Sequence, residues 1–264
     1  MNTRQLALIK KDIRSITSNK QVFMIMLIVP LALTIVLPSI LVFVTVLFPE
    51  SATDFQTLLN MLPITEQRGN QEQMIVGLVL NKIMPAFFLM IPIMASSVMA
   101  ASSFVGEKEK HTLETLLYSP LSLRQLFQSK IVAGFSIGMM VSFISFAAMI
   151  IVLEIEMLFL TGAAIMPDIS WLIVMLLIAP AISLVAIGIT VRGSAKAQTI
   201  EEAQQRAVFL IFPIIALVIG QFTGVIMVSS WLLLGMGIVL ALIAALIIKG
   251  VAGKFTYERL ISSS

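Results

Sequence analysis

The sequence predicts an all-α integral membrane protein with six transmembrane helices and both termini in the cytoplasm. Hydrophobic residues make up 59% of the 264 residues and charged residues only 12%, whereas a soluble domain has about 25% charged residues. The apolar residues form long runs, and the basic residues gather between alternate runs. These observations exclude a water-soluble globule. They predict that residues 1–264 form one multi-pass transmembrane domain in the cytoplasmic (inner) membrane.

The absence of cysteine and the single histidine limit the chemistry of the chain. Without cysteine there is no disulfide framework, zinc–thiolate site or iron–sulfur cluster, and one histidine cannot form a His cluster for a transition metal. The net charge of +3 fits membrane orientation better than nucleic-acid binding. We therefore expect no metal and no nucleic-acid partner.

The first element is an amphipathic helix within residues 1–21. Its apolar side chains share one helical face because of their spacing: Leu6, Ile9, Ile13 and Ile16. The basic side chains fall largely elsewhere: Arg4, Lys10, Lys11 and Arg14. This pattern predicts a helix at the cytoplasmic interface, with its basic side towards anionic headgroups. It is either a membrane anchor alone or also part of a partner-docking surface.

The spans follow from run length, since about 20 apolar residues cross roughly 30 Å of hydrocarbon. Four runs predict spans at about 22–48, 83–104, 131–153 and 171–191. The run 207–248 has no charged residue and as a helix would extend roughly 63 Å. That length predicts two further spans, at about 207–228 and 231–248, with a turn at Ser229-Ser230.

The orientation follows from the basic residues. All but two of the 17 Lys and Arg residues lie in the N-terminal segment, after the second and fourth spans, or in the C-terminal tail. The exceptions are Arg68 and Lys82. Because basic loops stay in the cytoplasm, this asymmetry places both termini there. Lys82 is then expected to extend to the outer interface.

The cytoplasmic loop 105–130 is the most informative segment. Residues 112–117 suit a short helix whose apolar face is made by three leucines: Leu113, Leu116 and Leu117. Ser119-Pro120 would end this helix, and Ser122 could cap the next one. Such a helix can sit in a groove of another protein. On composition alone, an ordinary solvated loop remains the alternative.

Motifs in this loop resemble those of the ABC type-2 exporter permeases, of the kind grouped with sodium and drug exporters. The residues that carry the resemblance are Gly106-Glu107-Lys108-Glu109, Thr112-Leu113-Glu114-Thr115-Leu116-Leu117 and Ser119-Pro120. Two further stretches are similar to the family's entry helix and to its loop before the fifth span: Lys11-Asp12-Ile13-Arg14-Ser15 and Ser194-Ala195-Lys196. The family often has short re-entrant helices between the last two spans, which here would be small and near Gly220 and Gly224.

The resemblance implies a permease subunit of an ATP-driven exporter. It implies a dimer with a second copy or a homologous permease, and a cytoplasmic ABC ATPase docked on the loop 105–130, with Glu107 as an anchor beside the hinge. The implied docking residues are Gly106, Glu107, Glu109, Thr112, Leu113, Leu116, Leu117, Tyr118, Ser119 and Pro120. ATP and Mg²⁺ would bind the partner ATPase, so this chain would carry no cofactor and would not itself be an enzyme.

Other motifs point to less specific roles. The stretch Gly134-x-Ser136-x-Gly138 matches a nucleophile-elbow pattern, but it lies inside an apolar run and predicts close helix packing. Nothing upstream of Gly253-Lys254 completes a phosphate-binding loop. Glu154 and Glu156 point about 200° apart on a helix and predict a solvated helix end rather than a cation site. Gln221 could join helices or line a pathway.

Two other functional classes fit the sequence less well. An ion-gradient-driven secondary transporter usually has inverted repeats and buried ionisable residues near the midplane, and the predicted spans have almost none. An intramembrane enzyme would need a catalytic dyad, a metal set or a carboxylate pair within the spans, and the sequence shows none. The exporter subunit is therefore the favoured hypothesis.

Overall fold

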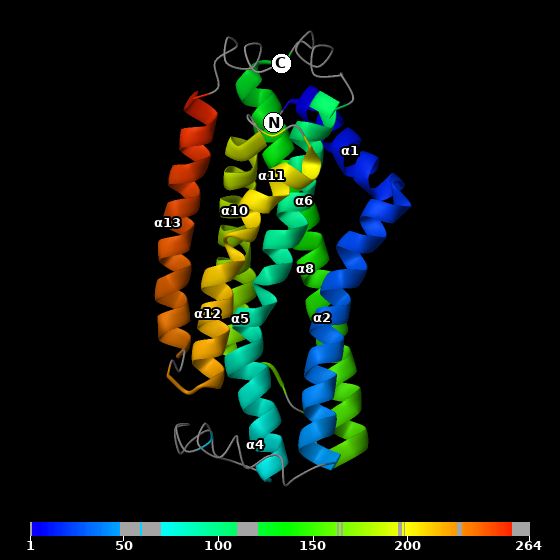
Figure 1. The fold of residues 1–264 in the computed structure, drawn as a ribbon, viewed down its shortest axis with the longest axis vertical. Helices are drawn as coiled ribbons and strands as arrows, with labels where there is room; N and C mark the ends of the chain where they lie inside the picture. Colours follow the sequence, from blue (N-terminus) through cyan, green and yellow to red (C-terminus); the bar gives the residue numbers. More distant parts are fainter. Residues whose placement is uncertain are drawn as a thin grey trace.

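The computed structural model describes residues 2–47, 70–109, 121–162, 166–194, 199–225 and 229–254, with the single residues 59, 164 and 197. Within these ranges all regular structure is helical, and the helices run along one axis as a bundle (Figure 1). The chain enters through α1 (Thr3–Ser18), which leads directly into α2 (Lys20–Leu47). The predicted interfacial segment is therefore a helix, as expected.

The rest of the bundle consists of long helices, some of them divided by irregular turns. Their bounds are α4 (Gln71–Leu78), η2 (Val79–Ile83), α5 (Met84–Phe88), α6 (Met90–Glu109), α8 (Leu123–Thr161), α9 (Ile169–Ile173), η3 (Val174–Ile178), α10 (Ala179–Ser194), α11 (Ile200–Val208), α12 (Ile211–Phe222) and α13 (Ser230–Lys254). In Figure 1, α1, the end of α6 and the end of α13 lie at one end of the bundle, called here the charged end.

Five stretches of the described chain are long and apolar enough to cross a membrane: Met26–Leu47, Gln71–Glu107, Arg124–Thr161, Ile169–Ser194 and Ser230–Gly250. They include the predicted second, third, fourth and sixth spans and most of the predicted first span, 22–48. The predicted span 207–228 differs, because its apolar helix is only Ile211–Phe222. The turn at Phe209-Leu210 separates that helix from α11, and Gly224, at φ 71°, lies in the turn that follows it. The described chain therefore has five long spans and one short apolar helix, where the sequence predicted six spans.

Two π-helical turns interrupt the second and fourth spans, and each lies just before a proline. Pro85 follows η2 and Pro180 follows η3. Proline has no amide hydrogen and clashes with the preceding turn, so the helix widens locally. Such turns leave backbone carbonyls available for other partners. Side chains from neighbouring helices use this opportunity at η2, as described below.

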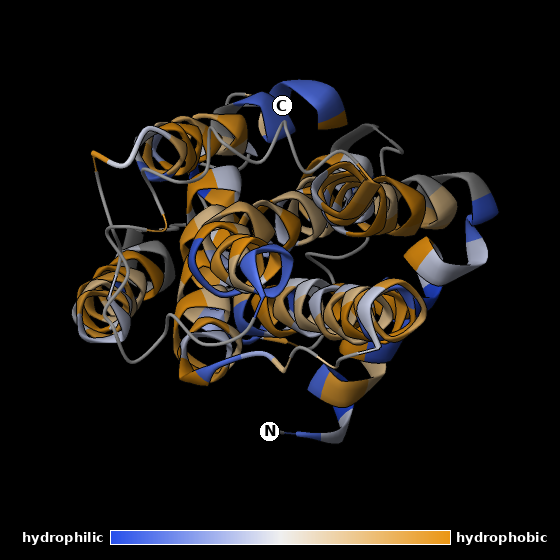
Figure 2. Cartoon of the chain, turned by 90° about the horizontal axis from the view of Figure 1, so that it is seen from below, coloured by the Kyte–Doolittle hydropathy of each residue, from blue (hydrophilic) through white to orange (hydrophobic). Residues whose placement is uncertain are grey.

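Small residues let the spans approach closely. A Cβ atom added at Gly138 of α8 would overlap Ser96 Oγ of α6, and one added at Gly188 of α10 would overlap Ile247 of α13. The contact at Gly138 confirms the prediction that the stretch Gly134-x-Ser136-x-Gly138 serves close helix packing. Viewed along the axis, hydrophobic residues dominate the helices (Figure 2). α13 is the least enclosed span, with only 17% of its most apolar stretch buried.

The close approach at Gly138 leads to a stability prediction. Gly138→Leu should lower the free energy of unfolding by about 1–3 kcal/mol, because overpacking forces side chains and backbone to shift. Gly235→Leu on α13 is the matched control, since a Cβ atom there meets nothing within 4 Å. Thermal unfolding in detergent measures both variants. Equal stabilities would contradict the close contact between α6 and α8.

Candidate functional site

The predicted docking loop joins α6 to α8 at the charged end. α6 ends at Glu109, and α8 begins at Leu123 with a capping box between Ser122 and Gln125, as the sequence predicted for Ser122. The predicted docking residues between these helices lie outside the described residues: Thr112, Leu113, Leu116, Leu117, Tyr118, Ser119 and Pro120. The structure therefore shows the two flanks of the loop, and a polar cluster joins them.

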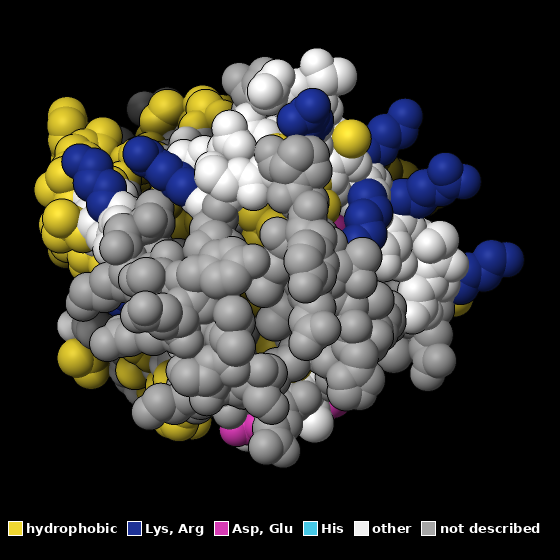
Figure 3. Space-filling view, turned by 90° about the horizontal axis from the view of Figure 1, so that it is seen from above, with side chains coloured by type: hydrophobic (Ala, Val, Ile, Leu, Met, Phe, Trp, Pro, Cys, Tyr) yellow, Lys and Arg dark blue, Asp and Glu magenta, His cyan; other side chains and the backbone are white. Residues whose placement is uncertain are grey.

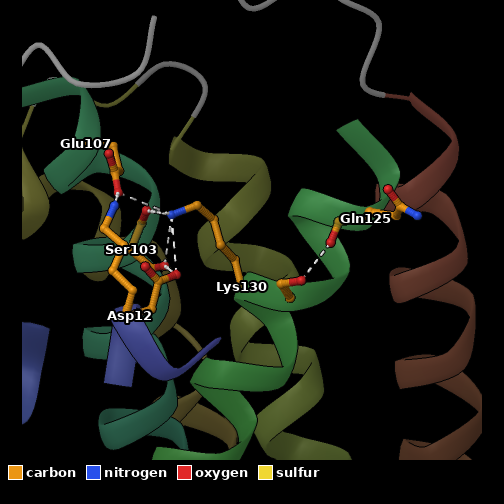
Figure 4. Close-up of polar contacts among 7 residues, drawn as sticks. Asp12, Ser103, Glu107, Gln125 and Lys130 are labelled. Atoms are coloured by element: carbon orange, nitrogen blue, oxygen red, sulfur yellow. Dashed lines mark hydrogen bonds and ion pairs between the residues drawn. The ribbon is translucent and has the colours of Figure 1, made fainter. Parts of the chain in front are cut away.

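Lys130 of α8 is the centre of this cluster (Figure 4). Its ammonium donates to the backbone oxygen of Ser103 and, at 3.2 Å, to Ser103 Oγ on α6. It also lies 3.5 Å from Asp12 Oδ2 on α1 and 3.9 Å from Glu107 Oε1 on α6. The Lys130 side chain is 2% exposed and that of Asp12 is 5% exposed. Three helices therefore meet at one buried ammonium group.

The remaining contacts complete what we call the Lys130 cluster: Lys11, Asp12, Ser103, Glu107 and Lys130. Ser103 Oγ donates to Asp12 Oδ2 at 2.8 Å. Lys11 donates to Glu107 Oε1 at 2.9 Å from a side chain that is 56% exposed. The cluster thus has two acidic and two basic side chains, so its formal charges balance. A buried ion pair is tolerated when its charges are compensated and hydrogen-bonded in this way.

Aromatic contacts cover the cluster on the side of α8. The Lys130 ammonium lies 5.5 Å from the centre of the Phe104 ring, a cation–π distance. Phe104 in turn stacks on Phe127, with ring centres 5.1 Å apart. A cavity of about 210 Å³ opens on the other side, beside Lys11, Ser15 and Ser102. The Lys130 cluster therefore borders both the aromatic rings of Phe104 and Phe127 and a cavity that its own residues help to line.

The buried face of α1 differs from the predicted apolar face. Ile9 and Ile16 are buried as expected, but Leu6 is 54% exposed, and Asp12 lies among the buried residues. Lys10, Lys11 and Arg14 are exposed and Ile13 is half-buried. α1 therefore packs on the bundle through a face that includes a carboxylate. A signal was present in the sequence, since Asp12 falls on the same face as Ile9 and Ile16.

α11 covers the other side of α6 near the loop. Its buried residues pack with Ala101 and Val105 of α6 in a small apolar cluster, in which Ala203 and Ile200 belong to α11. A Cβ atom added at Gly106 would lie 3.7 Å from Ile200 Cδ1. Gly106 and Glu107 are thus placed between α11 and α1. Among the described side chains, Lys and Arg gather on the face of this end (Figure 3).

A second polar group lies at the opposite end of the bundle, around η2. The indole of Trp171 donates to Leu80 O at 3.1 Å, and Gln221 Nε2 donates to Lys82 O at 2.7 Å. Lys82 Nζ lies 3.8 Å from Asp168 Oδ2 and its side chain is 13% exposed. Lys82 therefore pairs with Asp168, and its extension to the outer interface stays a prediction. Gln221 thus joins α12 to the second span, which is one of its two predicted roles.

The described part of the chain offers no group of three or more His, Cys, Asp or Glu residues that could hold a metal ion. Glu154 and Glu156 both lie in α8, and the Oε2 atom of Glu156 is buried without a hydrogen-bond partner. The Lys130 cluster lies at the base of the predicted docking loop and joins α1, α6 and α8.

Comparison with known proteins identifies the family. The model of a family described as "ABC-2 family transporter protein" matches residues 37–201. The matched range includes both flanks of the loop and most of the Lys130 cluster. Comparison with curated proteins and with solved structures gave no match. Because the family model covers more than half of the chain, the chain belongs to the ABC-2 transporter family and is a multi-pass membrane protein.

Proposed function

We propose that this chain is the membrane subunit of an ATP-driven exporter in the cytoplasmic membrane. A separate ABC ATPase would dock on the loop 105–130 and would hold ATP and Mg²⁺, while this chain would have no enzymatic activity of its own. Two copies, or one copy and a homologous permease, would enclose the substrate pathway. The family supports a permease of an ABC transporter, and the geometry at the charged end supports the docking site.

The observation that carries the proposal is the link between the two flanks of the loop. Lys130 of α8 is bonded to Ser103 of α6 just before the loop leaves α6. Force applied to the loop would therefore reach both spans together, because neither flank can move far without the other. Closure of the ATPases would tilt the second and third spans and change the cavity between the two permeases.

The topology proposed here has six crossings. Ile200 lies near Gly106 at the charged end, and Gln221 bonds to Lys82 at the other. Helical residues 82–106 extend about 36 Å, close to the roughly 30 Å of bilayer hydrocarbon. α11 and α12 together cover that distance, with the turn at Phe209-Leu210 between them. Counted with the five long spans, this kinked pair would make six crossings, an even number that would leave both termini in the cytoplasm.

Thiol labelling tests this orientation. Cysteine introduced at Ser51 should react with an impermeant reagent from outside intact cells, and cysteine introduced at Glu201, which is exposed on α11, should react only after permeabilisation. The unaltered chain has no cysteine and gives no background. Reversed labelling would place the loop 105–130 outside the cell and would exclude ATPase docking there.

The separation of transport and hydrolysis is tested with the purified chain. Without a partner it should hydrolyse ATP no faster than background, because the sequence has no phosphate-binding loop. Addition of the partner ATPase should give hydrolysis that depends on a phosphate-loop lysine of the partner. Turnover by the homogeneous chain alone would contradict the proposal.

A further inference from the structure

We propose that the Lys130 cluster clamps α1 to α6 and α8, so that movement of the loop 105–130 is passed through α1 to the first span, α2. This inference rests on the proposed function and deepens it, since it adds a third driven span to the two that the loop joins directly. Lys130 and Asp12 act here as positioning residues.

The first step is the attachment of α1. Asp12 on α1 accepts from Ser103 of α6 and lies within 3.5 Å of the Lys130 ammonium of α8. Lys11 makes a second link, to Glu107 of α6. These bonds join residues about 90 positions or more apart in the chain. The view in Figure 4 shows the three helices meeting at these side chains. Both flanks of the loop are therefore bonded to the same turn of α1.

The second step is the junction between α1 and α2. Only Asn19 separates the two helices. Its amide donates to Ile16 O of α1 at 3.1 Å, and its carbonyl accepts from Phe23 N of α2 at 2.9 Å. The backbone of Asn19 therefore forms hydrogen bonds with both α1 and α2. A displacement of α1 is passed to α2 because there is no flexible linker to absorb it.

The third step is the freedom of α2 to respond. Only 22% of the most apolar stretch of Met26–Leu47 is buried, compared with 67% for Gln71–Glu107. Few side chains therefore have to be repacked when α2 changes its tilt. Pro30 and Pro38 also lie inside α2, and proline weakens the helix against bending. α2 is continuous with α1 at Asn19 and packs on the bundle through one stripe of buried residues, which includes Met26, Thr34 and Val42.

The experiment measures distances between spin labels in the complex with the ATPase, without nucleotide and after trapping with ADP and vanadate. The chain has no native cysteine, so only introduced cysteines are labelled. One pair reports the clamp, from Arg14 on α1 to Gln128 on α8. Two other pairs report movement against Val239 on α13, one from Ile40 on α2 and one from Ile144 on α8. All five positions are exposed.

The clamp predicts that trapping changes both distances to Val239 and leaves the distance from Arg14 to Gln128 unchanged. In the triple variant Lys11→Met, Asp12→Leu and Lys130→Met, which removes the bonds from α1 to Ser103, Glu107 and Lys130, the movement of Ile144 should persist and that of Ile40 should be lost. Removing Asp12 and Lys130 together keeps the fold, because a buried pair can be replaced by neutral groups with little cost, and the exposed Lys11 ion pair contributes little. Lys10→Met, an exposed lysine of α1, is the control and should behave as the unaltered chain.

Two results would overturn the clamp while leaving the proposed function intact. In one, Ile40 moves equally in the triple variant; in the other, the distance from Arg14 to Gln128 changes on trapping in the unaltered chain. A different result, no movement of Ile40 or Ile144 in the unaltered chain, would contradict the proposed function itself and the clamp with it.

Discussion

Replacing Lys130 alone with methionine is expected to destabilise the protein strongly. The substitution leaves Asp12 buried without its cation, and it removes the donor to Ser103 and the neighbour of Glu107. Removing one partner of a buried pair typically costs about 3–5 kcal/mol, because an uncompensated charge stays in an apolar environment. Thermal unfolding in detergent, with the chain purified from membranes, measures the loss.

The double variant Asp12→Asn with Lys130→Met separates a charge effect from lost side-chain volume. It should recover most of the stability, since both buried charges are gone and the introduced asparagine keeps an acceptor for Ser103 Oγ. Lys11→Met should cost no more than about 1 kcal/mol, because an exposed ion pair contributes little; Lys11 is 56% exposed. If the single and double variants were equally destabilised, the side chain of Lys130 would matter for its volume and not for its charge.

Much of the fold follows from the sequence because apolar run length is a strong signal in a bilayer. The first, third and sixth spans were placed within a few residues of α2, the core of α8 and α13. The helices extend beyond the predicted spans; α8, for example, continues to Thr161. The length of an apolar run does not show that a helix continues through charged residues such as Glu154. The entry helix was found from its 3.6-residue period.

The irregular parts of the fold could not be predicted in the same way. Pro85 and Pro180 indicate local disturbance, but whether a helix kinks, breaks or widens to a π-turn depends on neighbours that donate hydrogen bonds to its freed carbonyls, as Trp171 and Gln221 do at η2. The short helix α12 was overestimated because Ala207–Leu210 and the residues after Phe222 are apolar too. Hydropathy alone does not show that the helix turns at Phe209 and ends at Thr223.

The site was predicted in part. The sequence points to the loop and to its flanks at Gly106, Glu107 and Ser122. It indicates Lys130 only as one of the basic residues that set the orientation in the membrane. The partners of Lys130, Asp12 and Ser103, are 118 and 27 residues away. Pairing over such distances is set by how the helices pack, which one sequence does not specify.

The second large effect concerns the predicted docking helix 112–117. Leu113→Asp should weaken association with the ATPase by tenfold to a hundredfold. A buried leucine contributes about 1.5–3 kcal/mol, and each factor of ten in affinity corresponds to about 1.4 kcal/mol. The loop lies outside the spans, so insertion and thermal stability should not change. Gln205→Asp is the matched control, because it adds the same charge on an exposed position of α11, outside the loop 105–130.

Recovery of the partner ATPase with this chain tests the central claim most directly. Tagged wild-type, Leu113→Asp and Gln205→Asp chains are expressed at equal levels and extracted from membranes, and the ATPase that co-purifies with each is quantified. We expect full recovery with the wild type and Gln205→Asp, and a loss of tenfold or more with Leu113→Asp. Equal recovery with all three chains would contradict ATPase docking on the loop 105–130.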